Sequence, residues 1–288
     1  MQYHILLGLA AFLLTAEFSL QKKYQITEGN GANAVLKFNA CYGLFTALAF
    51  FCLNGFRVDF SVFSVWMAFS FSFCCVMYLL LGFRIMAKGN MALYSLFLMI
   101  GGMIVPYVFG VLCLNEPLTL LRIIGLLLMF AAMVLTGNTK WNGARTTLLL
   151  CVAVFFLNGT CSVIAKCHSI DTTHGAVGDL QYVMFSGVGR LLFSSVALCF
   201  CKRKAEKSAH PHRPLWVLSG FSAIVGGISF ALQLVGAAHL PATVTYPLIS
   251  GGSIVFSTLA GMLVFKETVT AKQWIGVFLC LTGTCFFL

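Results

Sequence analysis

The chain has 288 residues, of which 60% are hydrophobic and only 9% are charged, and its mean hydropathy is +0.95. Soluble globular proteins carry about 25% charged residues, so this composition argues against a water-soluble protein and favours apolar helices in a lipid bilayer. The formal net charge of +10 does not indicate nucleic-acid binding, because the basic residues lie in short segments between apolar runs, where they set membrane topology.

Ten apolar segments follow one another along the chain, each of about 17–25 residues, the length that a bilayer-spanning helix requires. The runs are near-continuous rather than alternating, which argues against a β-barrel. The polar segments between them are too short to form an extramembrane domain. We therefore predict an all-α integral membrane protein with ten transmembrane helices, at residues 3–21, 34–54, 61–83, 91–114, 119–137, 146–166, 179–200, 215–238, 242–265 and 270–288.

The end of the chain repeats a stretch from its middle. Gly101–Gly137 and Gly252–Leu288 align without a gap, and their matching residues are 151 positions apart. The matched pairs are Gly101 and Gly252, Gly110 and Gly261, Glu116 and Glu267, Thr119 and Thr270, and Gly125 and Gly276. A constant offset over two helix-length runs indicates an internal duplication, so we predict two five-helix units, residues 1–139 and 140–288. Because five is an odd number, the second unit must enter the membrane from the opposite side, which predicts an inverted repeat.

The ends of the two halves also resemble a known family. Each half has a helix with Gly and Pro, then a Glu in a tight loop (Asn115-Glu116-Pro117 and Lys266-Glu267-Thr268), and then a short apolar helix. A Lys closes the first helix of each half, at Lys23 and Lys166. Over essentially its whole length the chain resembles the ten-helix EamA-type members of the drug/metabolite transporter superfamily. The resemblance implies a carrier of small metabolites, drugs or amino acids, with a central cavity lined by the first four helices of each half. It also implies fifth helices at the periphery, where they serve packing or contacts in a homodimer.

Two arguments about membrane orientation disagree. The loops after odd-numbered segments carry most of the Lys and Arg, notably Lys202–Arg213, and the positive-inside rule then places these loops in the cytoplasm and both termini outside. Members of the family usually have both termini in the cytoplasm. The orientation therefore stays open, in a chain that we expect in the cell membrane, as in the inner membrane of a bacterium.

Three charged residues within the apolar segments are candidates for the mechanism. A charge in lipid costs at least about 2.5–3.5 kcal/mol, so each should face a cavity or a partner. Glu17 is either a coupling carboxylate, which exchanges a proton or a cationic substrate, or an interfacial carboxylate paired with Lys22. Arg190 is too deep to snorkel easily, and it either neutralises Glu17 across the cavity or binds an anionic group of the substrate. Lys37 is a weaker candidate, because near the start of its segment it can snorkel to the interface.

Uncharged polar side chains in the segments are further candidates for substrate binding. Asn158 and Gln233 lie in the middle of their segments and can hydrogen-bond either the substrate or a neighbouring helix. The fourth helix of each half carries the remaining four, Tyr94, Ser95, Tyr246 and Ser250.

The same two fourth helices contain proline and paired glycines. Pro106 and Pro247 are expected to break or bend them, which would free carbonyl groups for a site or a hinge. Gly101-Gly102 and Gly251-Gly252 allow the backbones of neighbouring helices to approach closely, which serves packing and, in an alternating-access protein, gating.

Glu116 and Glu267 do not form a catalytic pair. Each precedes the start of a helix, where a carboxylate complements the helix dipole. An inverted repeat would also place them at opposite membrane faces. We therefore assign both residues to helix capping.

The sequence favours a secondary active transporter, not an enzyme. Its partners are a small-molecule substrate, the lipid bilayer and, if transport is coupled, protons. No cofactor or metal is expected, because the 12 Cys form no CxxC pair, the His are isolated, and no nucleotide-binding or hydrolase motif accompanies them. Two alternatives stay open. One is a membrane enzyme that acts on a lipid, which would need Asp, Glu and His clustered at one interface, and the other is a non-transporting scaffold or sensor.

Overall fold

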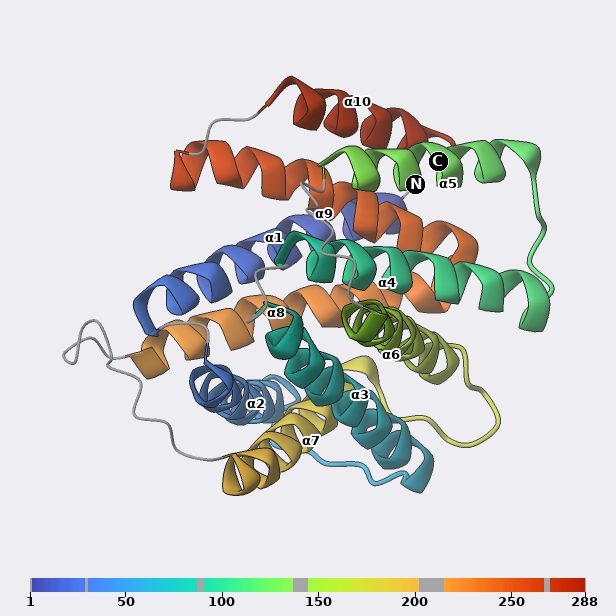
Figure 1. Cartoon of the computed structure of the whole chain (residues 1–288). Coiled ribbons are helices and arrows are strands. Elements are labelled where there is room, and N and C mark those ends of the chain that lie inside the picture. The colour runs from blue at the N-terminus through green and yellow to red at the C-terminus, as the bar shows by residue number, and fades with distance from the viewer. Residues whose placement is uncertain are drawn as a thin grey trace.

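Ten helices make up the part of the chain that the computed structural model describes, which comprises residues 2–28, 31–86, 91–136, 145–201, 215–266 and 270–287 (Figure 1). They are α1 (Gln2–Glu28), α2 (Ala32–Leu53), α3 (Val62–Met86), α4 (Met91–Cys113), α5 (Leu120–Thr136), α6 (Arg145–Ser169), α7 (Asp179–Phe200), α8 (Leu215–His239), α9 (Ala242–Phe265) and α10 (Ala271–Cys285). Each predicted segment corresponds to one helix, so the all-α prediction is confirmed. The helices α1 and α3 extend beyond the predicted apolar segments. Their last turns contain polar or basic residues, which hydropathy does not detect, but these turns are still helical.

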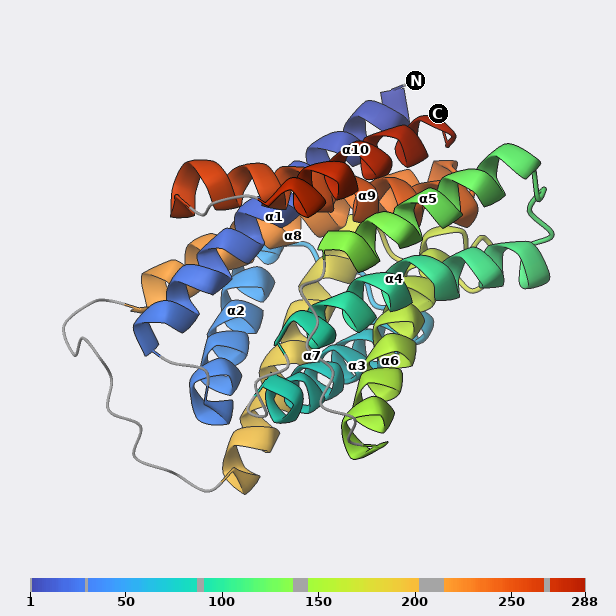
Figure 2. The same cartoon turned by 45° about the horizontal axis from the view of Figure 1, so that its top comes forward.

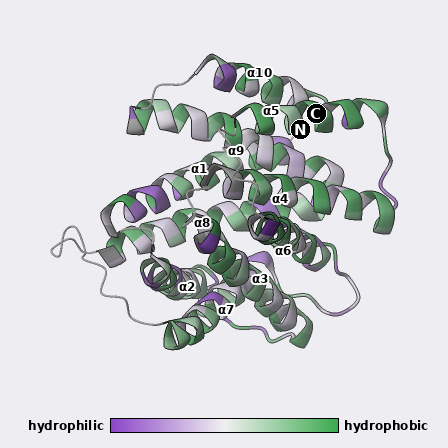
Figure 3. Cartoon of the chain, in the orientation of Figure 1, coloured by the Kyte–Doolittle hydropathy of each residue, from purple (hydrophilic) through white to green (hydrophobic). Residues whose placement is uncertain are grey.

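Eight of the helices in the described residues are long and apolar enough to cross a membrane. The exceptions are α5, with an apolar stretch of Leu120–Leu135, and α10, which has 15 residues. Hydrophobic residues make up most of the helices (Figure 3), and many of the large apolar side chains are exposed. Trp66 and Trp216, for example, keep 72% and 61% of their surface exposed, as is expected where lipid is the solvent.

The principal helix pairs are preserved when α1–α5 are exchanged for α6–α10. The helix α1 packs on α8 and α9, and correspondingly α6 packs on α3 and α4. The pairing of α2 with α8 corresponds to that of α7 with α3. The pairs α2·α7, α4·α9 and α5·α10 each join a helix to its own counterpart. The α5·α10 pair lies together along one side of the bundle (Figures 1 and 2).

The helices α2 and α7 are antiparallel, and their backbones approach each other closely at two glycine residues. The Asn39 amide donates a hydrogen bond of 2.7 Å to the Ser194 hydroxyl, and further along α2 Gly43 meets Gly187, earlier in α7. A Cβ on Gly43 would lie 2.6 Å from the Gly187 carbonyl oxygen, so only glycine allows this approach. The helices α5 and α10 are also antiparallel, because Gly125 contacts Phe287 whereas Met129 contacts Gly283.

The two prolines do not break their helices. Pro106 lies inside α4 and Pro247 inside α9, both buried, and each helix continues through its proline. The predicted break therefore does not occur, whereas the alternative of a bend stays a prediction.

Candidate functional site: a charged cavity between the two halves

A cavity of about 490 Å³ lies in the centre of the bundle. Its described lining comes from α1, α2, α3 and α4 of the first half and from α6, α7, α8 and α9 of the second, and it includes no residue of α5 or α10. This volume lies within the range of about 300–1,000 Å³ that is typical of small-molecule sites. The cavity has the helix composition that the family resemblance implied.

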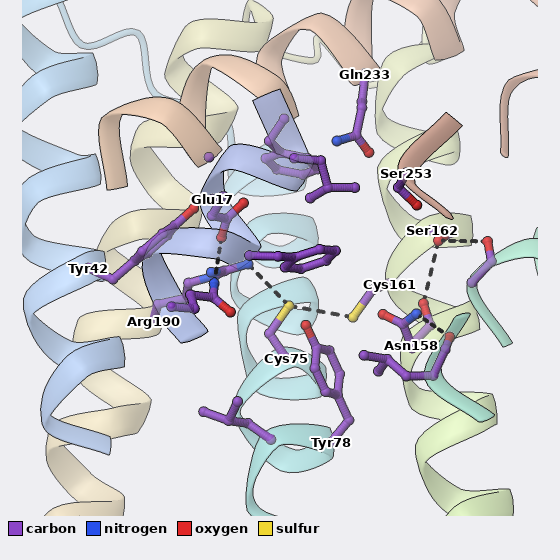
Figure 4. Close-up of a pocket in the computed structure, with 18 of the residues that line it drawn as sticks. Glu17, Tyr42, Cys75, Tyr78, Asn158, Cys161, Ser162, Arg190, Gln233 and Ser253 are labelled. Carbon is purple, nitrogen blue, oxygen red and sulfur yellow. Dashed lines mark hydrogen bonds between the residues drawn. The ribbon is translucent and has the colours of Figure 1, made fainter. Parts of the chain in front are cut away.

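The centre of the cavity brings a buried carboxylate and a guanidinium together (Figure 4). Glu17 on α1 is only 7% exposed, and its Oε1 accepts a hydrogen bond of 2.8 Å from Gln21. Arg190 on α7 interacts electrostatically with this carboxylate, and its Cζ lies 4.9 Å from the centre of the Tyr42 ring. The Arg190 guanidinium also lies 5.8 Å from the Phe71 ring. Aromatic faces and an opposite charge together stabilise a cation that has left water.

Small residues on α7 and α8 make room for this charged group. A Cβ on Gly189 would lie 2.7 Å from Ser72 Oγ, so α7 can approach α3 closely just before Arg190. Gly226 on α8 faces both the Glu17 carboxylate and the Tyr42 hydroxyl, and any side chain at that position would collide with them. The glycines therefore let three helices converge on Glu17 without filling the cavity.

The opposite wall of the cavity is a polar seam between α4, α6 and α9. The Asn158 amide donates a hydrogen bond of 2.7 Å to the Leu98 carbonyl oxygen. The Ser162 hydroxyl donates to the Gly102 carbonyl oxygen at 3.4 Å, and the Tyr246 hydroxyl donates to the Ser162 carbonyl oxygen at 2.5 Å. These bonds cross between helices, so the seam ties α6 to its neighbours in both halves.

At one end of the cavity, two charged side chains form hydrogen bonds to the backbone around the connection between α8 and α9. Glu116 accepts hydrogen bonds from the backbone N–H groups of Ala242 and Thr243, at 2.6 and 2.8 Å. The buried Lys166 Nζ donates to the carbonyl oxygens of Ala237 and Leu240, at 2.5 and 2.7 Å. A carboxylate at the start of α9 and an ammonium at the end of α8 both complement the helix dipoles. We call Glu116, Lys166 and the backbone that they hold the α8–α9 clamp.

The cavity extends in the other direction to the last turns of α1 and the first turns of α2. Lys22, Gln25 and Val35 line it there. This is the end of the bundle opposite the α8–α9 clamp, because Tyr3 at the start of α1 stacks on His239 at the end of α8, with ring centroids 4.1 Å apart. The two ends of the cavity are therefore built differently.

Comparison with known proteins identifies the second half of the chain. The EamA-like transporter family matches residues 146–288. Residues 146–288 belong to this family. The chain is accordingly a multi-pass membrane protein with an EamA-like domain, and the family resemblance of the second half is confirmed.

A curated relative matches a shorter part. The probable 4-amino-4-deoxy-L-arabinose-phosphoundecaprenol flippase subunit ArnE of Proteus mirabilis (strain HI4320) is 36% identical over 62 residues, which are 22% of this chain and 52% of the relative. The match thus spans about half the length of the curated relative. A crystal structure with 16% sequence identity has a TM-score of 0.75 and covers 99% of this chain and 96% of that one, which shows a shared fold.

Most of the predicted site residues lie at the cavity. Gln233 lines it and donates a hydrogen bond of 3.1 Å to Ser229 Oγ. The other predicted residues in the lining are Glu17, Arg190, Asn158, Tyr94, Ser95, Tyr246, Ser250 and Gly102. Asn158 lines the cavity and also makes an interhelical hydrogen bond. Its position therefore suits both of its predicted roles, substrate binding and helix packing.

The paired glycines lie at close approaches between helices. A Cβ on Gly101 would collide with the backbone of Phe155 on α6. Gly251 faces Met129 and Thr284 on α5 and α10, and Gly252 faces Ala11 on α1. Three of the four therefore pack helices together outside the cavity lining, and only Gly102 belongs to it.

One prediction needs correction, and one cannot be assessed. Lys37 is exposed and does not belong to the cavity lining, which agrees with its interpretation as a residue that snorkels to the interface. Glu116 is a helix cap, but of α9 in the other half rather than of the helix that follows it. Glu267 lies outside the described residues.

Among the cavity residues that the sequence analysis missed are Tyr42, Cys75 and Cys161. Tyr42 lies one helical turn after Asn39 and before Thr46, and this polar stripe on α2 could have revealed it. The two cysteines carry no such signal, because isolated Cys in an apolar helix usually behaves as a small apolar residue. Within the described ranges no group of three or more His, Cys, Asp or Glu could hold a metal ion.

Proposed function

We propose that this chain is a secondary transporter that moves a small zwitterionic solute, such as an amino acid, by rocking of two inverted halves. One observation carries the proposal: a buried carboxylate and a guanidinium share a cavity of small-molecule size between the halves. Charges inside a membrane protein are costly and usually belong to a substrate or ion pathway. The membership of residues 146–288 in a transporter family supports transport rather than catalysis.

The inverted arrangement is supported by the helix packing. Exchanging the halves preserves the principal helix pairs, as a two-fold axis between the halves would require. The axis would map α2 onto α7 and α5 onto α10, and both of these pairs are antiparallel. A two-fold axis that relates antiparallel helices is perpendicular to them and would lie in the membrane plane. Such an axis makes the inward-open and outward-open states nearly equivalent, which is the geometry of alternating access.

The lining of the cavity favours a solute with both charges and an apolar group. Arg190 can bind a carboxylate with two parallel hydrogen bonds, and Glu17 can accept hydrogen bonds from an ammonium group. Next to them, Phe71 and Phe230 are stacked with ring centroids 4.8 Å apart and offer an apolar surface. When a solute binds, it would take over part of the interaction between Glu17 and Arg190. Glu17 would then exchange a proton or a cationic group of the substrate during the cycle, while Arg190 stays charged.

A thermal-stability screen tests this proposal. Detergent-solubilised protein is heated with amino acids, amines, carboxylates, drugs and phosphoryl lipids, the last because the curated relative is named as a flippase subunit. We expect stabilisation by amino acids in the wild type and its loss in both Glu17→Gln and Arg190→Met. Lys37→Met, which removes an exposed charge outside the cavity, should respond as the wild type does.

Transport is then measured with the stabilising solute in liposomes, with and without a pH gradient. Uptake by the wild type and by Lys37→Met, but not by the two cavity variants, supports the proposal. Stabilisation only by a lipid, or solute binding that survives both cavity substitutions, would contradict the assignment of Glu17 and Arg190. A protein that binds the solute but moves none across the bilayer would be a sensor instead.

A further inference from the structure

Two cysteines from different halves lie side by side in the cavity wall. Cys75 on α3 and Cys161 on α6 have their sulfur atoms 3.7 Å apart (Figure 4). The two side chains are 5% and 4% exposed, and both line the cavity. A disulfide needs a separation of about 2.0 Å, so its formation requires the two side chains to rotate towards each other.

The surroundings of the pair favour its chemistry. The Arg190 guanidinium lies 3.6 Å from Cys75 Sγ, and a cation beside a sulfur stabilises negative charge on it. The thiolate is the form of cysteine that reacts with oxidants. The Cys161 thiol, by contrast, donates to the Phe71 carbonyl oxygen at 3.6 Å. This arrangement favours Cys75 as the nucleophile and Cys161 as the thiol that resolves the product.

We propose that Cys75 and Cys161 form an oxidant-sensitive pair that closes to a disulfide between the two halves. Hydroperoxides such as hydrogen peroxide are the oxidant, and they are small enough to enter the cavity. The Cys75 thiolate attacks one peroxide oxygen, the O–O bond breaks, and the second oxygen leaves as water after it takes up a proton, which produces a sulfenic acid. The Cys161 sulfur then attacks Cys75 Sγ, and the sulfenic hydroxyl leaves as a second water with the proton of Cys161. Two thiols and one peroxide thus become one disulfide and two waters.

The disulfide would join α3 of the first half to α6 of the second. Disulfide formation itself does not depend on the proposed transport function. The effect of the disulfide on transport does depend on that function. If the halves rock against each other, a covalent bond between them in the cavity wall would hold the protein in one state. Cellular peroxide would then switch the transporter off, and a dithiol reductant would restore it.

A cleavable full-length chain tests the disulfide directly. A protease site is inserted between residues 137 and 144, which connect α5 to α6, so that cleavage separates the fragments that carry Cys75 and Cys161. The purified protein is treated with hydrogen peroxide, blocked with a maleimide, cleaved, and run on a denaturing gel without reductant. We expect a band at full length that dithiothreitol converts into two halves.

Variants identify the cysteines that take part. Cys75→Ser and Cys161→Ser should each abolish the linked band, whereas Cys151→Ser should retain it, because Cys151 is fully buried on α6 and outside the cavity lining. Peptide mass spectrometry of the wild type should find the Cys75–Cys161 cross-link, so the test holds even if a variant folds poorly. Separation of the halves after peroxide, or a cross-link that uses the neighbouring Cys74, would overturn the proposal.

Discussion

Removing the carboxylate of Glu116 should destabilise the bundle, because no other described side chain caps α9. The N-cap residue of α9 is Pro241, and it makes no side-chain hydrogen bond to the helix. Both carboxylate oxygens of Glu116 instead accept backbone hydrogen bonds there, at 2.6 and 2.8 Å. Glu116→Ala removes both acceptors at once.

The expected loss follows from the number and kind of these bonds. Hydrogen bonds to a charged group contribute about 1.5–3 kcal/mol each, and the lower value applies because Glu116 is partly exposed and water can replace some of the lost contact. We therefore expect Glu116→Ala to lower the free energy of unfolding by about 3 kcal/mol. Glu116→Gln keeps one oxygen acceptor and should lose about half as much, about 1.5 kcal/mol.

Unfolding in mixed detergent micelles, followed by the fluorescence of the four Trp residues, measures this loss. The control is Lys272→Ala, which removes an exposed charge from the first turn of α10 and should change stability by no more than about 0.5 kcal/mol. If Glu116→Ala were as stable as this control, the α8–α9 clamp would have no energetic role. The reasoning about Glu116 would then be refuted, although the cavity would be unaffected.

Three further predictions address other contacts. Gly43→Ala should destabilise the bundle by about 1–3 kcal/mol, because its Cβ would meet backbone atoms of α7 at 2.6 Å, whereas Gly8→Ala, which has open space, should be neutral or stabilising in the same unfolding assay. Lys166→Met should cost about 2–3 kcal/mol in that assay, since two carbonyl oxygens at the end of α8 lose a charged donor; stability equal to the wild type would contradict this. The hydrogen bond from His174 lowers the pKa of Asp171 from 3.8 to about 2, so Asp171 contributes stability that is complete well above pH 3.8 and is lost as the pH falls towards 2. Asp171→Asn should therefore make the decrease in stability over this range smaller, and a decrease of unchanged size would contradict this.

The helices could be predicted well from the sequence, because length and hydropathy are local properties. The duplicated Gly…Glu…Gly stretch also predicts two halves, and this division stays a prediction. The effect of Pro106 was not predictable in the same way. Whether a proline breaks a helix depends on what the neighbouring helices cover, and the sequence does not contain that information.

The cavity was only partly predictable, for a physical reason. Deep charges such as Glu17 and Arg190 stand out in an apolar segment, because lipid does not tolerate them. Cys75 and Cys161 do not stand out, since the same apolar composition suits a helix face towards lipid and one towards the core. The cap on α9 by Glu116 joins residues 126 positions apart, and no local pattern reports such a contact.

Access to the cavity from the two sides of the membrane tests the central claim most directly. Ser250 on α9 lines the cavity, so Ser250→Cys in a chain without other cysteines places a reporter there. The protein is reconstituted in one orientation in liposomes, and a maleimide that cannot cross the bilayer is added outside or enclosed inside. The account predicts that the reporter reacts from both sides, each in separate vesicles, while the vesicles stay sealed. Reaction from one side only would contradict alternating access and leave a fixed, one-sided binding pocket.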